Sequence, residues 1–184
     1  MSPAITTVSN MKTPIEFVLQ FAPSEIDSLA ERYGFAQDDD ALLAGKRIVS
    51  GDYSMDNLKV IVNWKSRRRA ALIDDNRDDH IAVALQFASA STTPDAMAVA
   101  VLTALHGVGI PMASAILTAI NPERYTILDF RALQSLGVEN WTDSVDFYVA
   151  YLDACRALAG QYGKTLRNLD RALWQWSKEQ NQTK

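Results

Sequence analysis

Apolar side chains recur along this chain every three or four residues, with polar residues between them. This spacing places the apolar side chains on one face of a helix, where they can pack against a core. Two clear stripes of this kind are Ala113, Ile116, Leu117 and Ile120, and Leu166, Leu169, Leu173 and Trp176. No segment alternates apolar and polar residues as a half-buried strand does. The pattern therefore predicts an all-α fold.

Capping residues and glycines predict where the helices begin and end. Thr13-Pro14 opens one helix, and Ser24 with Asp27 three residues later caps a second helix that stops at Gly34. The other predicted helices cover about 39–48, 54–64, 78–88, 93–106, 130–136 and 142–162, and the last begins near Thr165.

Three consecutive aspartates, Asp38, Asp39 and Asp40, precede the apolar part of the helix predicted at 39–48. Acidic residues in a first turn are stabilised by the positive end of the helix dipole. A metal site is the other interpretation, but no second group of ligands follows at a useful spacing. We therefore predict an acidic helix start and no metal.

A hairpin of two short helices is predicted at about 93–121. Gly107 and Gly109 flank Val108, and Pro111 lies where the first turn of a helix tolerates a missing N–H. Backbone N–H groups at such a turn and at the following helix start can bind a phosphate. A contact of this kind positions a protein on nucleic acid without reading base identity.

Length and composition predict a single domain over 1–184, with 48% hydrophobic and 22% charged residues. No apolar run reaches the length of a membrane span, and the N-terminus has no signal-peptide pattern. Cys155 is the only cysteine, which excludes an internal disulfide and suits a reducing cytoplasm. We expect a cytoplasmic protein that does not bind membranes.

The net charge of −4 argues against a protein that coats nucleic acid generically. The charge is unevenly distributed, however. Residues 1–45 hold seven acids and two bases, so the other 139 residues carry a net charge of +1. The distribution is compatible with a locally basic face.

Residues 105–131, LHGVGIPMASAILTAINPERYTILDFR, combine L-x-G-V-G, a helix of small residues and P-x-x-Y-x-I-L-D. This pattern resembles the helix-hairpin-helix DNA glycosylases whose Gly/Pro-rich loop ends in an aspartate (the HhH-GPD superfamily). The resemblance implies a multi-helix fold built around the helix-hairpin-helix, with an aspartate loop at 122–131. The loop aspartate of that family is catalytic, and Asp129 occupies its place, 20 residues after Gly109.

The chain departs from the family pattern at three places. Bifunctional members carry a lysine two positions after the second glycine, where this chain has Pro111, so a Schiff-base lyase built on that position is excluded. The four-cysteine iron–sulfur cluster of some members is impossible with Cys155 alone. His106 replaces a common proline before the first glycine, and Phe130-Arg131 replaces the usual small or His-type residues. We expect no cofactor.

Asp129 has two interpretations. It can cap the helix predicted at 130–136, which is a common role for aspartate. The family resemblance implies instead that Asp129 is the catalytic carboxylate. Such a carboxylate stabilises the cationic sugar that forms when an N-glycosidic bond breaks, or it activates water. The nucleotide must first be flipped out of the duplex.

The densest basic cluster consists of Lys65, Arg67, Arg68 and Arg69, next to Trp64. It is either a solvated helix end, favourable to the helix dipole, or a set of contacts to the DNA backbone. Of the two interpretations of Trp64, we favour a core residue over a residue of the pocket.

Two further pocket candidates belong to the aspartate loop at 122–131. Tyr125 is a core aromatic first, and Arg131 pairs either with a phosphate or with Asp129. His80 and His106 are too isolated to be metal ligands, and His106 is expected near the phosphate of the hairpin.

The sequence leaves two functions open. The first is a monofunctional DNA glycosylase-like protein that uses Asp129 to excise a damaged base in base excision repair. The second is a DNA-binding or interaction module that keeps the fold and has lost the chemistry. DNA, bound through phosphate contacts, is the expected partner of both.

Overall fold

The computed structural model describes residues 15–34 and 38–182 of the chain. All regular elements in these ranges are helices, which confirms the predicted all-α class. The chain divides into two compact units, which are described separately. Unit 1 combines Met1–Gly34 with Leu128–Lys184, and unit 2 is Phe35–Ile127. The single domain over 1–184 stays a prediction, because compactness does not show whether the units unfold together.

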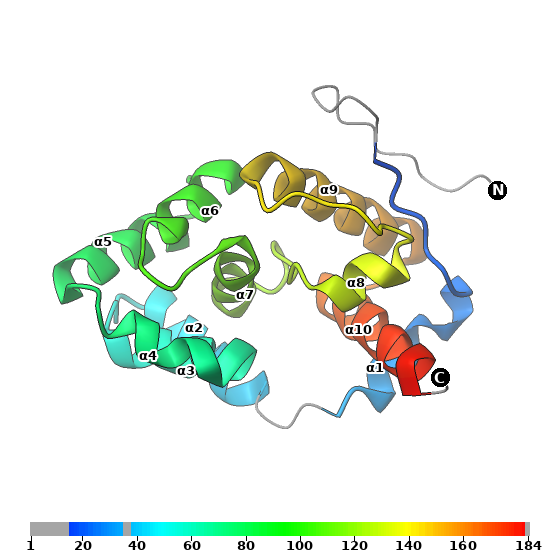
Figure 1. The fold of residues 1–184 in the computed structure, drawn as a ribbon, viewed down its shortest axis with the longest axis horizontal. Helices are drawn as coiled ribbons and strands as arrows, with labels where there is room; N and C mark the ends of the chain where they lie inside the picture. Colours follow the sequence, from blue (N-terminus) through cyan, green and yellow to red (C-terminus); the bar gives the residue numbers. More distant parts are fainter. Residues whose placement is uncertain (1–14, 35–37, 183–184) are drawn as a thin grey trace. The chain divides into compact units, whose positions relative to one another are not determined.

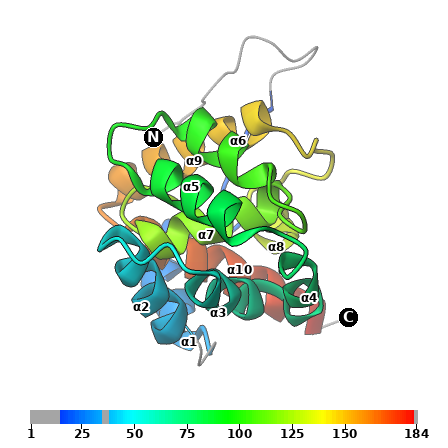
Figure 2. The same ribbon diagram turned by 90° about the vertical axis from the view of Figure 1, so that its left-hand side faces the viewer.

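Unit 2 packs its helices around α7. Its elements are α2 (Asp38–Val49), α3 (Met55–Ser66), the 3-10 turn η2 (Arg67–Arg69), α4 (Ala70–Ile73), α5 (Asp78–Ser89), α6 (Asp95–Thr103) and α7 (Ile110–Ile120). Figure 1 shows α7 end-on with the other helices of the unit beside it, and Figure 2 shows α5 and α6 side by side. Every residue of α7 except Pro111 is buried, as expected for a helix that is apolar all round.

A glycine permits a close contact inside unit 2, between α2 and α7. A Cβ atom built on Gly45 would lie 1.8 Å from the carbonyl oxygen of Ala119 and 2.8 Å from the backbone nitrogen of Ile120. No side chain fits at such distances, so α2 can approach the backbone of α7 only with glycine at this position.

Unit 1 contains η1 (Pro23–Glu25), α1 (Ile26–Arg32), α8 (Phe130–Ser135), α9 (Val145–Tyr162) and α10 (Leu166–Gln182). Helix α10 packs against α1, α8 and α9, so the two ends of the chain share this unit. Glu179 on α10 accepts two hydrogen bonds from Arg32 on α1, at 2.9 and 3.1 Å. The Phe17 ring lies 6.0 Å from Phe147 and 6.1 Å from Tyr151 on α9.

The predicted helix at Thr13-Pro14 begins outside the described residues, and residues 15–22 are not helical. This segment instead pairs with the end of α8. The N–H of Val18 donates to the carbonyl of Leu136, and the N–H of Gln20 donates to that of Ser135, both at 2.9 Å. Long-range backbone pairing of this kind leaves no mark in local periodicity.

The other predicted helices are present, with ends that match or are shifted by at most three residues. The acidic first turn of α2 is confirmed, with α2 starting at Asp38. The predicted Ser24 cap is wrong, because the 3-10 turn η1 precedes α1 and the cap residue is Glu25. Gly137 follows α8 with φ +71°, and Gly163 ends α9 with φ +63°, in the left-handed region that favours glycine.

Unit 1 buries its cysteine and an ion pair. Cys155 on α9 has no exposed surface, and its burial raises the pKa of the thiol far above its usual range. On α10 the Arg167 guanidinium pairs with the Asp170 carboxylate, and both side chains are about nine-tenths buried.

Within residues 15–34 and 38–182, no helix is both long and apolar enough to span a membrane.

Candidate nucleic-acid interface

The predicted hairpin is present as α6, a turn over 104–109, and α7. The N–H of Val108 donates to the carbonyl of Leu105 at 3.1 Å, so this donor is used inside the turn. The expected contact of Val108 with DNA stays a prediction. Gly109 is the N-cap of α7. The N–H groups of Gly109 and Ile110 donate to no described residue. These two donors stand at the positive end of the α7 dipole, where an anion is favoured.

Gly107 fixes the shape of the turn. Its φ of +85° is one that other residues rarely adopt. A Cβ atom at Gly107 would lie 2.7 Å from the Cβ of Leu72 and 3.4 Å from the Cδ1 of Ile73. The turn therefore lies directly against α4, and glycine is required both for its backbone angle and for this contact.

Asn76 holds the other side of the turn. Its side chain donates to the carbonyl of His106 at 3.0 Å and accepts the N–H of His106 at 2.7 Å. The Nδ1 of His106 lies 3.0 Å from the carbonyl of Leu72 and 3.3 Å from a carboxylate oxygen of Asp75. Because a carbonyl can only accept, Nδ1 is the donor of that bond. The expected place of His106 at a phosphate stays a prediction.

The basic cluster forms the turn that leads into α4. Arg67, Arg68 and Arg69 make up η2, and all three side chains are exposed. Their guanidinium groups form no ion pair or hydrogen bond with any residue that the structure describes. Lys65 is half-buried at the end of α3. Because α4 follows η2 and contacts Gly107, two predicted contact regions lie on neighbouring segments of unit 2.

Acidic residues follow the arginine turn, but several are paired. Asp74 forms an ion pair with Lys59, and Arg77 donates to both oxygens of Asp79, at 2.9 and 2.7 Å. The Arg77 hydrogen bonds lower the pKa of Asp79 to about 2. These pairs reduce the negative charge beside the arginines, although Asp75 and Asp78 remain in the same segment.

The two aromatic pocket candidates of unit 2 are core residues. Trp64 is 6% exposed and Tyr125 is 2% exposed. The Arg124 guanidinium lies 5.0 Å from the centre of the Tyr125 ring. Burial is the first role the sequence indicated for both; their second role as pocket walls stays a prediction.

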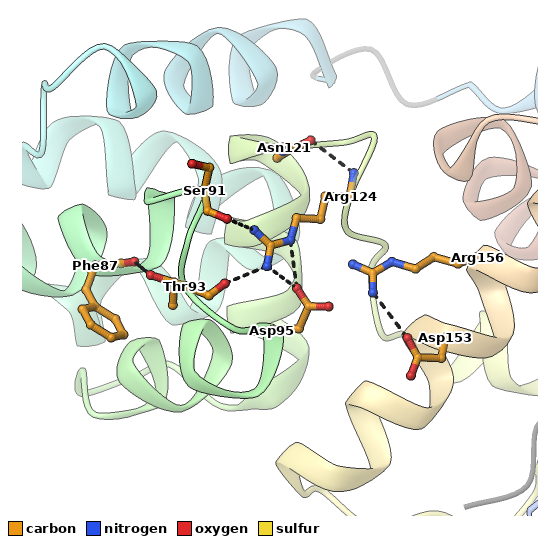
Figure 3. A network of polar contacts seen from close by, with 8 residues as sticks. All are labelled: Phe87, Ser91, Thr93, Asp95, Asn121, Arg124, Asp153 and Arg156. Atoms are coloured by element: carbon orange, nitrogen blue, oxygen red, sulfur yellow. Dashed lines mark hydrogen bonds and ion pairs between the residues drawn. The ribbon is translucent and has the colours of Figure 1, made fainter.

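Arg124 is a structural residue that the sequence reasoning missed. Figure 3 shows its guanidinium donating to Asp95, at the start of α6, and to the backbone carbonyls of Ser91 and Thr93. Its own N–H donates to the side chain of Asn121, just after α7, at 3.1 Å. The network joins the loop before the hairpin to the loop after it. No local pattern reveals it, because Asp95 and Arg124 are 29 residues apart.

Asp129 lies in unit 1, at the start of α8, whereas the hairpin belongs to unit 2. One carboxylate oxygen, Oδ1, accepts the N–H of Arg131 at 2.9 Å, which confirms that Asp129 caps α8. The side chain is half-buried. Its catalytic role stays a prediction.

Arg131 contacts aromatic rings. Its guanidinium lies 5.0 Å from the centre of the Phe130 ring and 5.4 Å from the Trp174 ring. The Nη1 atom is buried and has no hydrogen-bond partner in the part of the chain that the structure describes. The expected pocket role of Arg131 stays a prediction, and the hydrogen bond from Arg131 to Asp129 uses the backbone N–H.

The fold defines an all-helical protein with two compact units. No family model matches the chain. No curated protein and no solved structure matches it.

Proposed function

We propose that this chain is a DNA glycosylase-like protein that binds the phosphate backbone of duplex DNA through the turn at 104–109 and the arginines of η2. The observation that carries the proposal is the juxtaposition in unit 2 of two kinds of donor. The N–H groups at the start of α7 donate to no residue of the described ranges. The exposed arginines of η2, which have no partner in those ranges, precede the helix that contacts the same turn.

This combination suits a polyanion. A helix N-terminus binds one phosphate through backbone donors, and arginines bind further phosphates along the strand. The contacts are to the backbone, so affinity will depend strongly on salt and little on sequence. The negative net charge confines this binding to a limited face of unit 2.

Binding of a labelled duplex at several salt concentrations tests the arginines. In the double variant Arg67→Gln/Arg68→Gln, affinity should fall and the slope of log affinity against log salt should decrease by about two units. The control is Lys46→Gln/Arg47→Gln, which removes the same charge from exposed positions on α2 of the same unit. An equal loss in both double variants would mean that only net charge matters.

A bulky residue at Gly109 tests the backbone donors. Gly109 has φ −89° and ψ 178°, extended angles that any residue adopts, so Gly109→Leu imposes no backbone strain. The side chain should instead block an approaching phosphate and weaken duplex binding. Unchanged binding by a folded Gly109→Leu protein would remove the turn from the interface.

We further propose that Asp129 gives the protein a monofunctional base-excision activity. The family resemblance of residues 105–131 supports this role, and Pro111 stands where a Schiff-base lysine would be required for strand cleavage. A panel of duplexes with different damaged bases, followed by alkaline cleavage at abasic sites, tests for excision. Trapping of a protein–DNA adduct by borohydride would contradict the monofunctional mechanism, and its loss in Lys65→Ala would identify Lys65 as the nucleophile.

The alternative is a DNA-binding module without this chemistry. The cap formed by Asp129 favours it, because a structural role is enough to explain the aspartate. Duplex binding together with no excision from any duplex of the panel would select this alternative.

A further inference from the structure

Helix α10 carries a cationic and aromatic stripe in addition to its apolar one. Arg167, Arg171, Trp174 and Lys178 are spaced at i, i+4, i+7 and i+11, so they share one face of the helix. This face differs from the apolar stripe that contains Leu169 and Leu173. The sequence pattern of α10 therefore distinguishes a core face from a second, chemically distinct face.

Cations and rings alternate along this face. Trp174 is flanked by the Arg131 guanidinium at 5.4 Å and the Lys178 ammonium at 5.1 Å, measured to the ring centre. Arg131 also lies 5.0 Å from the Phe130 ring. These four side chains, from α8 and α10 of unit 1, form a series that we call the stacking ladder: Phe130, Arg131, Trp174, Lys178.

The ladder continues into the end of α1. The Tyr33 ring meets Trp174 edge-on at 5.2 Å between centres. Two more guanidinium groups lie near Tyr33, those of Arg167 at 5.6 Å and Arg171 at 5.9 Å. Asp170 forms an ion pair with Arg167 within the protein.

The outer end of the ladder is accessible. Phe130 is 61% exposed, although a large apolar side chain is usually covered in a folded protein. Lys178 forms no ion pair with any residue in the described ranges, and the neighbouring Glu179 is hydrogen-bonded to Arg32. The exposed Phe130 ring lies next to Arg131, and Lys178 lies at the other end of the same series. Rings that alternate with cations in this way are the chemistry of a site for stacked, negatively charged groups.

We propose that the stacking ladder binds unpaired nucleotides of a nucleic-acid strand. Phe130 offers a face on which a base can stack, Arg131 beside it attracts the adjacent phosphate, and Lys178 attracts a phosphate farther along the strand. Single strands are bound in this way by proteins that alternate aromatic and basic side chains. Paired bases in a duplex are already stacked on one another, so the ladder binds single strands in preference to duplexes. This inference rests on the proposed function only in taking nucleic acid as the ligand.

The test is binding of the full chain to two fluorescein-labelled probes, a 12-nucleotide strand of deoxythymidine and a 12-base-pair duplex. We expect Phe130→Ala to weaken single-strand binding by about tenfold, the loss typical of one base stack, and Phe130→Ala/Lys178→Gln to weaken it further. Duplex affinity should change less than twofold in Phe130→Ala. Far-UV circular dichroism checks the fold, which Phe130→Ala should preserve because the ring is exposed.

Matched controls lie in unit 2. Phe87→Ala removes a ring that is 43% exposed on α5, and Lys46→Gln removes an exposed positive charge from α2. Both should bind the strand as the unmodified protein does. Equal losses in the controls and the ladder variants would overturn the proposal.

The remaining outcomes separate this inference from the proposed function. Strand binding that depends on Phe130, without duplex binding, supports the ladder and contradicts the duplex proposal. Duplex binding with a strand affinity that the ladder variants leave unchanged overturns the ladder alone. An unmodified chain that binds neither probe overturns both. Displacement of the strand by an equimolar acidic peptide would reassign the ladder to a protein partner.

Discussion

Gly107 is the residue whose replacement should disturb the hairpin turn most directly. Gly107→Ala places a Cβ both at a φ of +85° and 2.7 Å from Leu72, so we expect a loss of about 2–4 kcal/mol in the free energy of unfolding. Gly51→Ala is the matched control, because Gly51 has φ +99° with no atom within 4 Å of a new Cβ. The control should lose only about 1–2 kcal/mol in the same urea titration.

Asp129→Asn separates the two proposed activities at the level of one side chain. Asparagine is also a good helix cap, so the free energy of unfolding should change little. Loss of the negative charge should lower excision by about 10²–10³, the usual effect of removing one electrostatic stabiliser of a transition state. Duplex binding should be kept or become tighter, because a carboxylate no longer repels the phosphates.

Single-turnover excision and a binding titration on the same preparation check this prediction. Excision at the unmodified rate would mean that Asp129 is only a cap and that any chemistry depends on other residues.

Some residue roles follow from the sequence and others do not. The Asp129 cap and the glycine turn at Gly107 were predictable, because both depend on neighbours within a few residues. The contact of Gly107 with Leu72 was not, because the two residues are far apart in the sequence. The bonds of His106 to Asn76 and Leu72 were not, because the partners lie 30 and 34 residues away. Local patterns specify caps and turns, whereas long-range polar contacts depend on the packing.

At the scale of elements, the approach of α2 to α7 depends on Gly45. In Gly45→Ala the new Cβ would lie 1.8 Å from a backbone oxygen of α7, so the helices must separate. We expect a loss of at least 1–3 kcal/mol, as for other overpacked cores. Gly160→Ala, on an exposed position of α9 with no atom within 4 Å, should instead stabilise the protein by about 0.5–1 kcal/mol.

Thermal or urea unfolding of the two alanine variants checks both signs. A Gly45→Ala protein as stable as the unmodified one would mean that α2 can shift without loss of packing.

Helix positions were more predictable than the uses of helix faces. The apolar stripe of α7 was visible in the sequence, and α7 is the buried centre of unit 2. Gly45, in contrast, looks in the sequence like a residue that weakens a helix. Its role in the close packing of α2 against α7 is visible only in the structure, where Ala119 lies opposite it. The charged face of α10 is not recognisable from the sequence, because its rings and cations are combined with Arg131 from another helix.

At the scale of the whole molecule, the units differ in how the chain forms them. Unit 2 is one continuous segment, whereas unit 1 joins both ends of the chain. We therefore expect a fragment of residues 35–127 to fold alone, with helical circular dichroism and cooperative thermal unfolding. A fragment of residues 128–184 should remain largely unfolded, because it lacks α1, which packs against α10. An unfolded 35–127 fragment would favour the single cooperative domain predicted from chain length.

This division was not visible in the sequence. No composition change or flexible linker marks the passage between units near Ile127 and Leu128, and the discontinuous unit 1 requires contacts between segments more than a hundred residues apart. Composition and periodicity indicate how much core a chain can build, but they do not indicate which distant helices share it.

The buried thiol of Cys155 makes the chain well suited to chemical labelling. A maleimide dye reacts with the thiolate form of cysteine. Burial of Cys155 disfavours the thiolate and also prevents the dye from reaching the sulfur. A new cysteine introduced at an exposed position will therefore react alone in the folded protein, with no need to remove the native one. Conversely, the slow labelling of Cys155 in the unmodified chain measures how often unit 1 opens.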